Sequence, residues 1–574
     1  MIPVLITWIW ILICSYLWGH LAIQIINRIL RKNVDTTLEF SIILGIGVLA
    51  IYSETFSLFL GVGLLANLLM LVVDIFVIAK WREVLVNRIK NLISEKRNVW
   101  YVIIIIFFVY ISMTYMFEVV TYDTGLYHSQ AVQWIEEYGV VPGLGNLHHR
   151  FAYNSAIMCL QALFSMKFLF GQQMHCVNGF MFILFTSYAV TSMKFVKNKR
   201  IYISDFLRAA FFIYYNMDTS FSSLGSDLIS LCLVIYIVIK YVEGIEDDIS
   251  NIEYYCYLSI LALIAISFKL SVALIVLIVI YPAYMLIKDK NWKLIVKLIS
   301  LGVVLTLPFL IRNIIISGYI VYPFPKLDLF SFDWKMNKYV CLWDAKEVKS
   351  WGQGVCDANL SPTFREWFEI WINRQSNANK CLFFASIIIS VLLVVISIVN
   401  YIKEKDLRKP VLSVTVLGML IYWFAGAPLM RYGIVFTIIP VLIFVGLLFS
   451  MLQSRLKKIT IISTLFIICI MGIRIFPFVS HVINFRISSD IVYYQVGYEP
   501  FEFTKAELDR VEIYIPENGD RIGNRAFPST PYINNLELIE LRGNDLSDGF
   551  RIKKNYKNAC FNTYGGFIDP IIFE

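Results

Sequence analysis

Charged side chains are scarce in this chain of 574 residues: Asp, Glu, Lys and Arg make up only 16% of it, while 58% of the residues are apolar. A soluble domain typically carries about 25% charged residues, so this sequence cannot cover a water-facing surface and a soluble protein is excluded. The net charge of +8 lies in short clusters between apolar runs, which argues against a nucleic-acid-binding protein.

Metal-ligand spacings are also missing from the sequence. It has 10 Cys and 6 His, with no CxxC pair and no Cys/His spacing of the kind that holds zinc. No internal repeat is evident, and nothing indicates the inverted halves with paired broken helices that mark many secondary transporters. Zinc-binding modules and inverted-repeat transporters are therefore disfavoured.

Long apolar runs dominate what is there. A run of about 20 apolar residues spans a bilayer core, and the sequence predicts about 14 such helices. They lie near 3–27, 40–58, 62–80, 100–117, 174–193, 205–221, 226–242, 254–270, 271–287, 298–317, 381–402, 411–427, 432–452 and 459–478. The first run is too long for a signal peptide and has no small-residue cleavage site, so we expect it to be a membrane helix.

Basic loops between the runs predict the orientation, because cytoplasmic loops are enriched in Lys and Arg. Clusters lie near 28–32, 82–97, 194–200, 288–297, 403–409 and 455–458. Both 80–98 and 194–208 are then cytoplasmic, yet three apolar stretches separate them. We expect the middle stretch, 155–170, to lie at the outer interface or re-enter the membrane. The alternative is a crossing there and none at one of its neighbours.

This orientation places three large segments outside: 118–173, 318–380 and 479–574. The predicted fold is an all-α polytopic membrane protein with interfacial helices and a small α/β extracytoplasmic C-terminal region. We divide it into N-terminal transmembrane helices (1–98), a transmembrane module that carries the first two outer segments (99–478), and the C-terminal domain (479–574). Alternating apolar residues at 511–515, followed by a turn at 517–520, predict β-structure in the last part.

The second outer segment contains several Trp residues, which either stack on sugar rings or anchor the membrane interface. Cys341 and Cys356 in the same segment would bridge in an oxidising compartment.

The first outer segment concentrates polar side chains next to the membrane. Asp123 lies just beyond a membrane helix, and it shares a face with Tyr127 and Gln130 if residues 124–138 form an amphipathic interfacial helix. An ionisable group in such a place is a functional candidate. We expect the polar residues of this segment to bind acceptor or substrate: Tyr122, Tyr127, His128, His148, His149, Arg150 and Asn154. The alternative is an ordinary loop in which Asp123 caps a helix.

A second carboxylate, Asp227, lies at the next outer tip. Two carboxylates at one face divide labour in many enzymes, one as general base and the other binding a metal or orienting the acceptor. N-capping of the helix that starts at Leu228 is the alternative for Asp227. Lys269, at the outer end of an apolar run, either binds a phosphate or snorkels to the interface.

Two arginines near outer helix ends are candidates for binding a donor phosphate. Arg312 lies within an apolar helix about one turn below its outer end, where a guanidinium requires an anion or a carboxylate. Its fork geometry suits the phosphate of a lipid carrier, and a structural salt bridge is the alternative. Arg431 repeats the pattern at another outer helix start. Neighbouring side chains are predicted to contact substrate as well: Asn313, Tyr322 and Tyr432.

The order of these motifs resembles the GT-C superfamily of membrane glycosyltransferases. After the two carboxylates come Pro308-x-x-x-Arg312-Asn313-x-x-x-x-Gly318-x-x-x-Tyr322-Pro323 and a late Arg431-Tyr432. More closely, Tyr122-Asp123-Thr-Gly-Leu-Tyr127-His128, followed by Gly139-Val-Val-Pro142-Gly-Leu-Gly145-Asn146-Leu-His148, resembles a family of bacterial multi-spanning proteins without assigned biochemistry. The tail of that family carries Gly-Asp and then Pro-x-Thr-Pro-Tyr, here Gly519-Asp520 and Pro528-Ser-Thr530-Pro531-Tyr532.

The resemblance implies an inverting glycosyltransferase in the bacterial inner membrane, with its active site facing outside. It would move a sugar from a polyprenyl-phosphate-linked donor to a glycan, lipid or protein acceptor. Asp123 would be the general base, Arg312 and Arg431 would neutralise the donor phosphate, and Asp227 would hold the acceptor or a metal. Whether a divalent metal such as Mg²⁺ or Mn²⁺ takes part stays open, because members of the superfamily differ.

Two other functions remain as alternatives. A transporter or flippase of lipid-linked glycans would need charged residues through the depth of the helix bundle, whereas here the polar residues gather at one face. A polysaccharide polymerase or ligase of another fold would share the outer segments and arginines but would not need Asp123.

Overall fold

The computed structural model describes residues 1–34, 36–94, 98–117, 121–195, 200–217, 220–453, 458–487, 490–495 and 501–556. They form a mostly helical protein in which ten helices are long and apolar enough to cross a membrane. Eight of the ten are single, complete helices: α1 (Ile2–Leu30), α2 (Leu38–Phe56), α12 (Asp227–Glu246), α15 (Trp292–Ser317), α18 (Asn377–Glu404), α19 (Arg408–Gly426), α20 (Met430–Gln453) and α21 (Ile459–Asn484).

The other two long runs are irregular. One is part of α3 (Leu64–Ser94), which is kinked at Trp81, and the other joins η3 (Leu270–Val279) to α14 (Ile280–Lys288). Three of the remaining predicted runs coincide with shorter apolar helices: α4 (Asn98–Tyr115), α9 (Val177–Thr191) and α13 (Ile252–Phe268). The fourth overlaps α11 (Ile203–Tyr215), which is shorter and carries Asp205 and Arg208. The prediction of a helical multi-pass membrane protein is thus confirmed, while the number of crossings stays a prediction.

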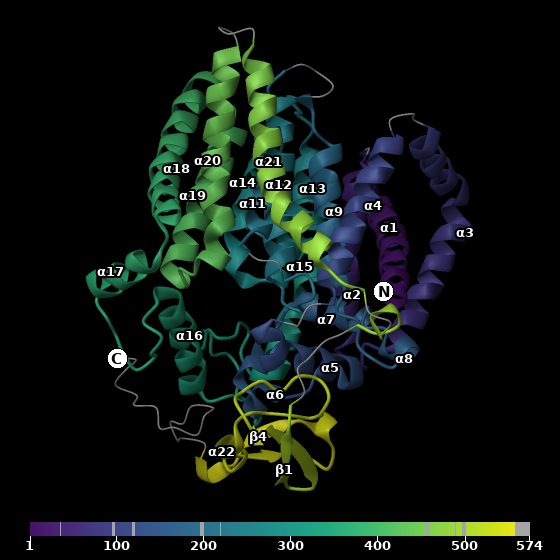
Figure 1. Cartoon of the computed structure of the whole chain (residues 1–574), viewed down its shortest axis with the longest axis vertical. Coiled ribbons are helices and arrows are strands. Elements are labelled where there is room, and N and C mark those ends of the chain that lie inside the picture. The colour runs from purple at the N-terminus through teal and green to yellow at the C-terminus, as the bar shows by residue number, and fades with distance from the viewer. Residues whose placement is uncertain are drawn as a thin grey trace.

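The basic loops meet at one end of the bundle, and the outer segments lie at the other end (Figure 1). Contacts between the loops establish the first end: Lys32 pairs with Glu253 at 3.2 Å, and Arg408 pairs with Asp248 at 2.8 Å. At the opposite end Figure 1 shows α16 (Lys338–Gln353), α17 (Phe364–Arg374) and the strands. One end of the apolar helix bundle therefore carries the basic loops, and the other end carries the outer segments.

The stretch 155–170 forms two short helices, α7 (Ala156–Leu163) and α8 (Lys167–Phe170), with a break between them. At 1.5 Å per residue the eight residues of α7 extend about 12 Å, too little to span a bilayer. All of α7 is buried inside the protein rather than lying on its surface. This stretch therefore does not lie on the lipid surface at α7, which packs between α2 and α5 (Ser129–Tyr138), while its re-entry into the membrane stays a prediction.

The expected interfacial helix over 124–138 is also corrected. Its first turn is a π-helix, η1 (Thr124–His128), and only the remainder is the α-helix α5. The wider turn changes the helical phase, so Gln130 does not share a face with Asp123: its amide contacts Ala526 and Ser529 of the C-terminal region. Most polar residues of α5 are buried as well, including Gln130, Gln133 and Glu136, whereas Glu137 is exposed.

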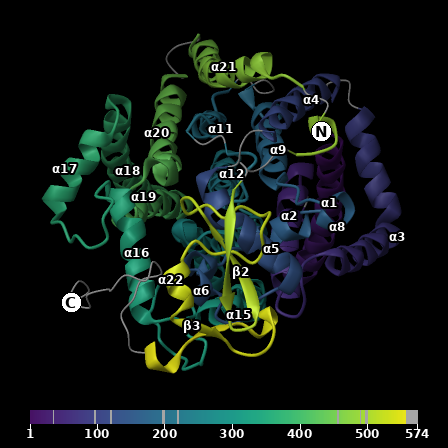
Figure 2. The same cartoon turned by 60° about the horizontal axis from the view of Figure 1, so that its bottom comes forward.

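The C-terminal region forms two small hairpins that dock on the first outer segment (Figure 2). β1 (Phe503–Leu508) pairs with β2 (Val511–Pro516), and β3 (Ile539–Leu541) pairs with β4 (Phe550–Ile552), both antiparallel. The backbone N–H groups of Ile522 and Gly523 donate to the carbonyl of Gly125 at 2.9 and 2.8 Å. These two hydrogen bonds hold the backbone close to Asp123, the predicted catalytic residue. Short helices complete the outer face: α6 (Leu144–Leu147), η2 (His149–Ala152), η4 (Asp490–Val492), α22 (Ile533–Leu536), η5 (Leu546–Asp548) and η6 (Lys554–Tyr556).

Two glycines let α1 and α2 pack backbone to backbone. A Cβ atom on Gly19 would lie 1.7 Å from the carbonyl oxygen of Ser41, and one on Gly45 would lie 1.7 Å from that of Ser15. No side chain fits at either position unless the helices separate.

The cysteines and tryptophans of the second outer segment serve packing. Cys341 is buried, Cys356 is exposed, and both are free, so the expected bridge is not formed. Trp367 and Trp371 are buried, and the indole N–H of Trp371 bonds to the carbonyl of Pro428. Trp351 is exposed, so sugar stacking and anchoring at the membrane interface both remain alternatives for it.

Candidate functional site

Four charged side chains meet where helix ends converge at the outer end. Asp123 precedes η1, Asp227 begins α12, Lys269 follows α13, and Arg431 lies in the first turn of α20. The Nη2 atom of Arg431 donates to the Asp123 carboxylate at 3.1 Å, and its Nε atom lies 3.9 Å from the Asp227 carboxylate. Lys269 forms an ion pair with Asp227. The structure thus joins four residues that the sequence singled out separately into one cluster, the charged quartet.

Neither carboxylate of the quartet acts as a helix cap. Asp123 occupies the N-cap position of η1 without a capping hydrogen bond, and Asp227 lies in the first turn of α12. Their charges are directed to Arg431 and Lys269 instead. The capping alternatives are therefore wrong, while snorkelling of Lys269 to the interface remains an alternative beside its ion pair with Asp227.

Aromatic rings border the quartet and leave it accessible. The Tyr432 hydroxyl lies 3.0 Å from a guanidinium nitrogen of Arg431, and the Lys269 ammonium lies 4.3 Å from the ring centre of Tyr432. The side chains of Arg431 and Asp123 are 37% and 34% exposed. A ligand can therefore reach both charges without unfolding the outer segments.

Burial and charge set the protonation states beside the quartet. Burial raises the pKa of the Asp123 carboxyl, but His128 and Arg431 lower it more, so its pKa lies below the ordinary value. Burial lowers the pKa of His128 to about 4. Because His128 is then neutral at pH 7, the guanidinium groups of Arg431 and Arg150 keep Asp123 ionised there.

We expect His128 to remain neutral throughout the range from about pH 5 to 8, where an ordinary histidine changes its charge. The measurement is a pH titration by NMR of histidine-labelled protein in micelles, with the signal assigned by its loss in His128→Gln. A His128 signal that titrates near pH 6.5 would contradict the buried, neutral ring described above.

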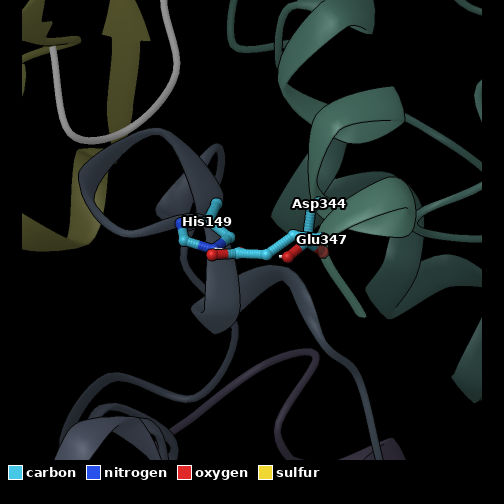
Figure 3. A group of neighbouring side chains, drawn as sticks. All are labelled: His149, Asp344 and Glu347. Atoms are coloured by element: carbon cyan, nitrogen blue, oxygen red, sulfur yellow. Dashed lines mark ion pairs between the residues drawn. The ribbon is translucent and has the colours of Figure 1, made fainter. Parts of the chain in front are cut away.

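A second cluster lies beside the first outer segment and joins His149, a predicted contact residue, to two carboxylates that were not predicted. His149 begins η2, and its Nε2 atom lies 3.3 Å from Asp344 and 3.8 Å from Glu347, both on α16 (Figure 3). Burial raises the pKa of Asp344, but His149 and Arg150 lower it overall. The only local signal was the spacing of the two carboxylates, which places them on one face of a helix.

Arg150 and a row of tyrosines connect the two clusters. A guanidinium nitrogen of Arg150 lies 3.5 Å from Glu347, and its charge also acts on Asp123. The ring centres of Tyr127 and Tyr153 are 6.3 Å apart, and those of Tyr153 and Tyr322 are 5.5 Å apart. The predicted contact residues Tyr127, Arg150 and Tyr322 therefore lie along one polar path from the quartet to the second cluster.

Arg312 does not join Arg431. Its side chain is only 2% exposed; it donates to Asn154 at 3.1 Å and to the hydroxyl of Ser57, and it interacts electrostatically with Glu54 on α2. The structural alternative describes Arg312 and Asn154 better than phosphate or substrate binding does, because buried partners already occupy both.

Three more predicted contact residues point away from the quartet. Asn313 is buried in α15, and the Tyr122 hydroxyl bonds to Asp520 of the C-terminal region. His148 packs against Tyr532, with a ring-centre distance of 4.8 Å. Their residue types suggested substrate contact, but the C-terminal region packs on the buried His148 and bonds to Tyr122, whose side chain stays exposed.

Comparison with known proteins places the chain in a protein family. A family described as a domain of unknown function (DUF8201) matches residues 1–438. The chain belongs to this family, whose match includes every member of both clusters and ends before the hairpins. No curated protein and no solved structure matches the chain.

Proposed function

We propose that the protein is an inverting glycosyltransferase that moves a sugar from a polyprenyl-phosphate-linked donor to a hydroxyl acceptor on a glycan, lipid or protein. The observation that carries this proposal is the charged quartet: an ionised, accessible carboxylate 3.1 Å from a guanidinium, with a second cation beside it. Inverting transfer needs a base at the acceptor hydroxyl and positive charge at the departing phosphate.

The charge balance of the quartet supports binding of an anion. Two cations and two carboxylates offset one another, so the quartet is nearly neutral before substrate arrives. A donor phosphate offers Arg431 a bidentate partner and would replace Asp123 on that guanidinium. Asp123 would then be free to accept the proton of the acceptor hydroxyl. In this scheme Asp227 holds Lys269 in place instead of binding a metal.

The arrangement of the bundle supports a reaction at the extracytoplasmic face. The basic loops lie at the end opposite the quartet, and such loops are normally cytoplasmic. A polyprenyl tail would remain in the bilayer while its phosphate reaches helix ends at the membrane surface. A bacterial inner membrane is the location that a polyprenyl-phosphate donor would imply.

Arg431→Gln and Lys269→Gln are each expected to weaken binding of undecaprenyl phosphate by about 10- to 100-fold, because a hydrogen bond to a charged group contributes about 1.5–3 kcal/mol. Affinity is measured on the purified full chain in nanodiscs. Lys167→Gln is the matched control, since Lys167 pairs with Glu137 at the same end of the protein.

Equal affinities of Arg431→Gln and Lys167→Gln would contradict the phosphate assignment. A second assay in proteoliposomes separates the alternatives. Movement of a lipid-linked glycan across the bilayer without a covalent change would favour a flippase over the enzyme.

A further inference from the structure

We propose that His149, Asp344 and Glu347 bind a divalent transition-metal cation of the Zn²⁺ or Mn²⁺ type at the junction of the first and second outer segments. This inference goes beyond the proposed glycosyl transfer, because it depends on the geometry of three side chains and not on what the quartet transfers.

The three side chains come from two elements and converge on one point (Figure 3). His149 begins η2, while Asp344 and Glu347 lie one turn apart on α16 and therefore share a face of that helix. One ligand atom from each residue lies within 4.8 Å of the others. His149 and Asp344 are buried, and the Glu347 side chain is 13% exposed.

The separations between these atoms are those of ligands around a metal. Two ligands at 2.0–2.2 Å from a tetrahedral ion lie about 3.4 Å apart. The His149 Nε2 atom lies 3.3 Å from Asp344 Oδ1 and 3.8 Å from Glu347 Oε2. Small side-chain shifts would complete the coordination, and solvent or a substrate oxygen would supply the remaining ligand.

Asp344 provides an independent reason to expect a cation. Its side chain is fully buried beside His149, whose Nε2 atom lies 3.3 Å from Oδ1, and beside the hydroxyls of Tyr153 and Tyr322, but none of these described groups donates a well-aligned hydrogen bond to it. A buried carboxylate without hydrogen bonds is costly unless a cation coordinates it. Arg150 lies 3.5 Å from Glu347 and offsets one of the two negative charges. A bound divalent ion would offset the other and leave one positive charge at the site.

The mixture of ligands selects the class of metal. Imidazole suits Zn²⁺ and related transition metals, and carboxylates suit Mn²⁺ as well, whereas Mg²⁺ and Ca²⁺ favour oxygen ligands throughout. Asp227, the metal ligand expected from the sequence, lies between Lys269 and Arg431, two cations that would repel a metal. The structure therefore moves the predicted metal from the quartet to the second cluster.

The test uses the full chain purified through a tag without histidine, stripped with EDTA and titrated with Zn²⁺ or Mn²⁺. We expect about one ion per chain by elemental analysis and a higher melting temperature on binding. Glu347→Gln and Asp344→Asn should each lower the affinity at least about tenfold. The matched control is Glu369→Gln, an exposed glutamate on the neighbouring helix α17.

Mn²⁺ is titrated as well as Zn²⁺, because cysteine thiolates of the chain can bind Zn²⁺ outside the cluster but are poor ligands for Mn²⁺. If Asp344→Asn fails to fold, Glu347→Gln decides the result, since the Glu347 side chain is partly exposed. The proposal is overturned if the wild-type protein binds neither metal. It is also overturned if Asp344→Asn and Glu347→Gln bind both metals as tightly as Glu369→Gln does.

Discussion

Asp123→Asn is expected to slow sugar transfer by about 10²- to 10⁴-fold, the usual contribution of a general base, while the protein still folds. The asparagine oxygen can accept the hydrogen bond that Arg431 now donates at 3.1 Å, so the local packing is retained. It cannot take a proton from the acceptor. Transfer of labelled sugar from polyprenyl-linked donors is measured in membranes that contain each variant.

Binding of undecaprenyl phosphate distinguishes a base from a phosphate ligand. Asp123→Asn removes the carboxylate that competes for Arg431, so the affinity of the variant for this lipid should be equal to or higher than that of the wild type. Asp333→Asn is the matched control, because Asp333 forms ion pairs with Arg542 and Arg551 at the surface. Wild-type transfer by Asp123→Asn would reject the base assignment.

Gly45→Leu is expected to destabilise the protein by about 2–3 kcal/mol or more, the cost of severe overpacking. The new side chain would begin 1.7 Å from the carbonyl oxygen of Ser15. Because that obstacle is backbone, α1 and α2 would have to move apart along their whole interface. The change should appear as a lower melting temperature in size-exclusion thermostability assays.

Gly472→Leu is the matched control for this packing prediction. Gly472 also lies in an apolar helix, α21, but a Cβ atom there meets no heavy atom within 4 Å. Equal melting temperatures for the two variants would show that the close contact between α1 and α2 contributes little to stability.

Hydropathy predicted the membrane helices well because their lengths and apolar content are local properties of the sequence. The runs near 3–27 and 381–402 coincide with α1 and α18. Local pattern failed where tertiary packing decides the structure. The stretch 155–170 breaks into α7 and α8, and the π-helical turn at 124–128 changes the phase that a regular helix would give Gln130.

The quartet was partly predictable, since Asp123, Asp227, Lys269 and Arg431 each stood out as charges at outer helix ends. Their pairing was not predictable, because it depends on how four distant elements converge. The same limit explains Arg312, which looked like Arg431 in sequence but bonds to Ser57 at the end of α2. It also explains His149 and Asp344, which are brought together by α16 folding back on the first outer segment.

The two hydrogen bonds from Ile522 and Gly523 to Gly125 have a consequence for biosynthesis. The turn that carries Asp123 leaves the ribosome early, whereas the amides that brace it are translated near the end of the chain. A nascent protein would therefore hold the turn beside Asp123 in an unbraced form until its last hairpins have been made. Maturation of the quartet would be coupled to completion of the chain.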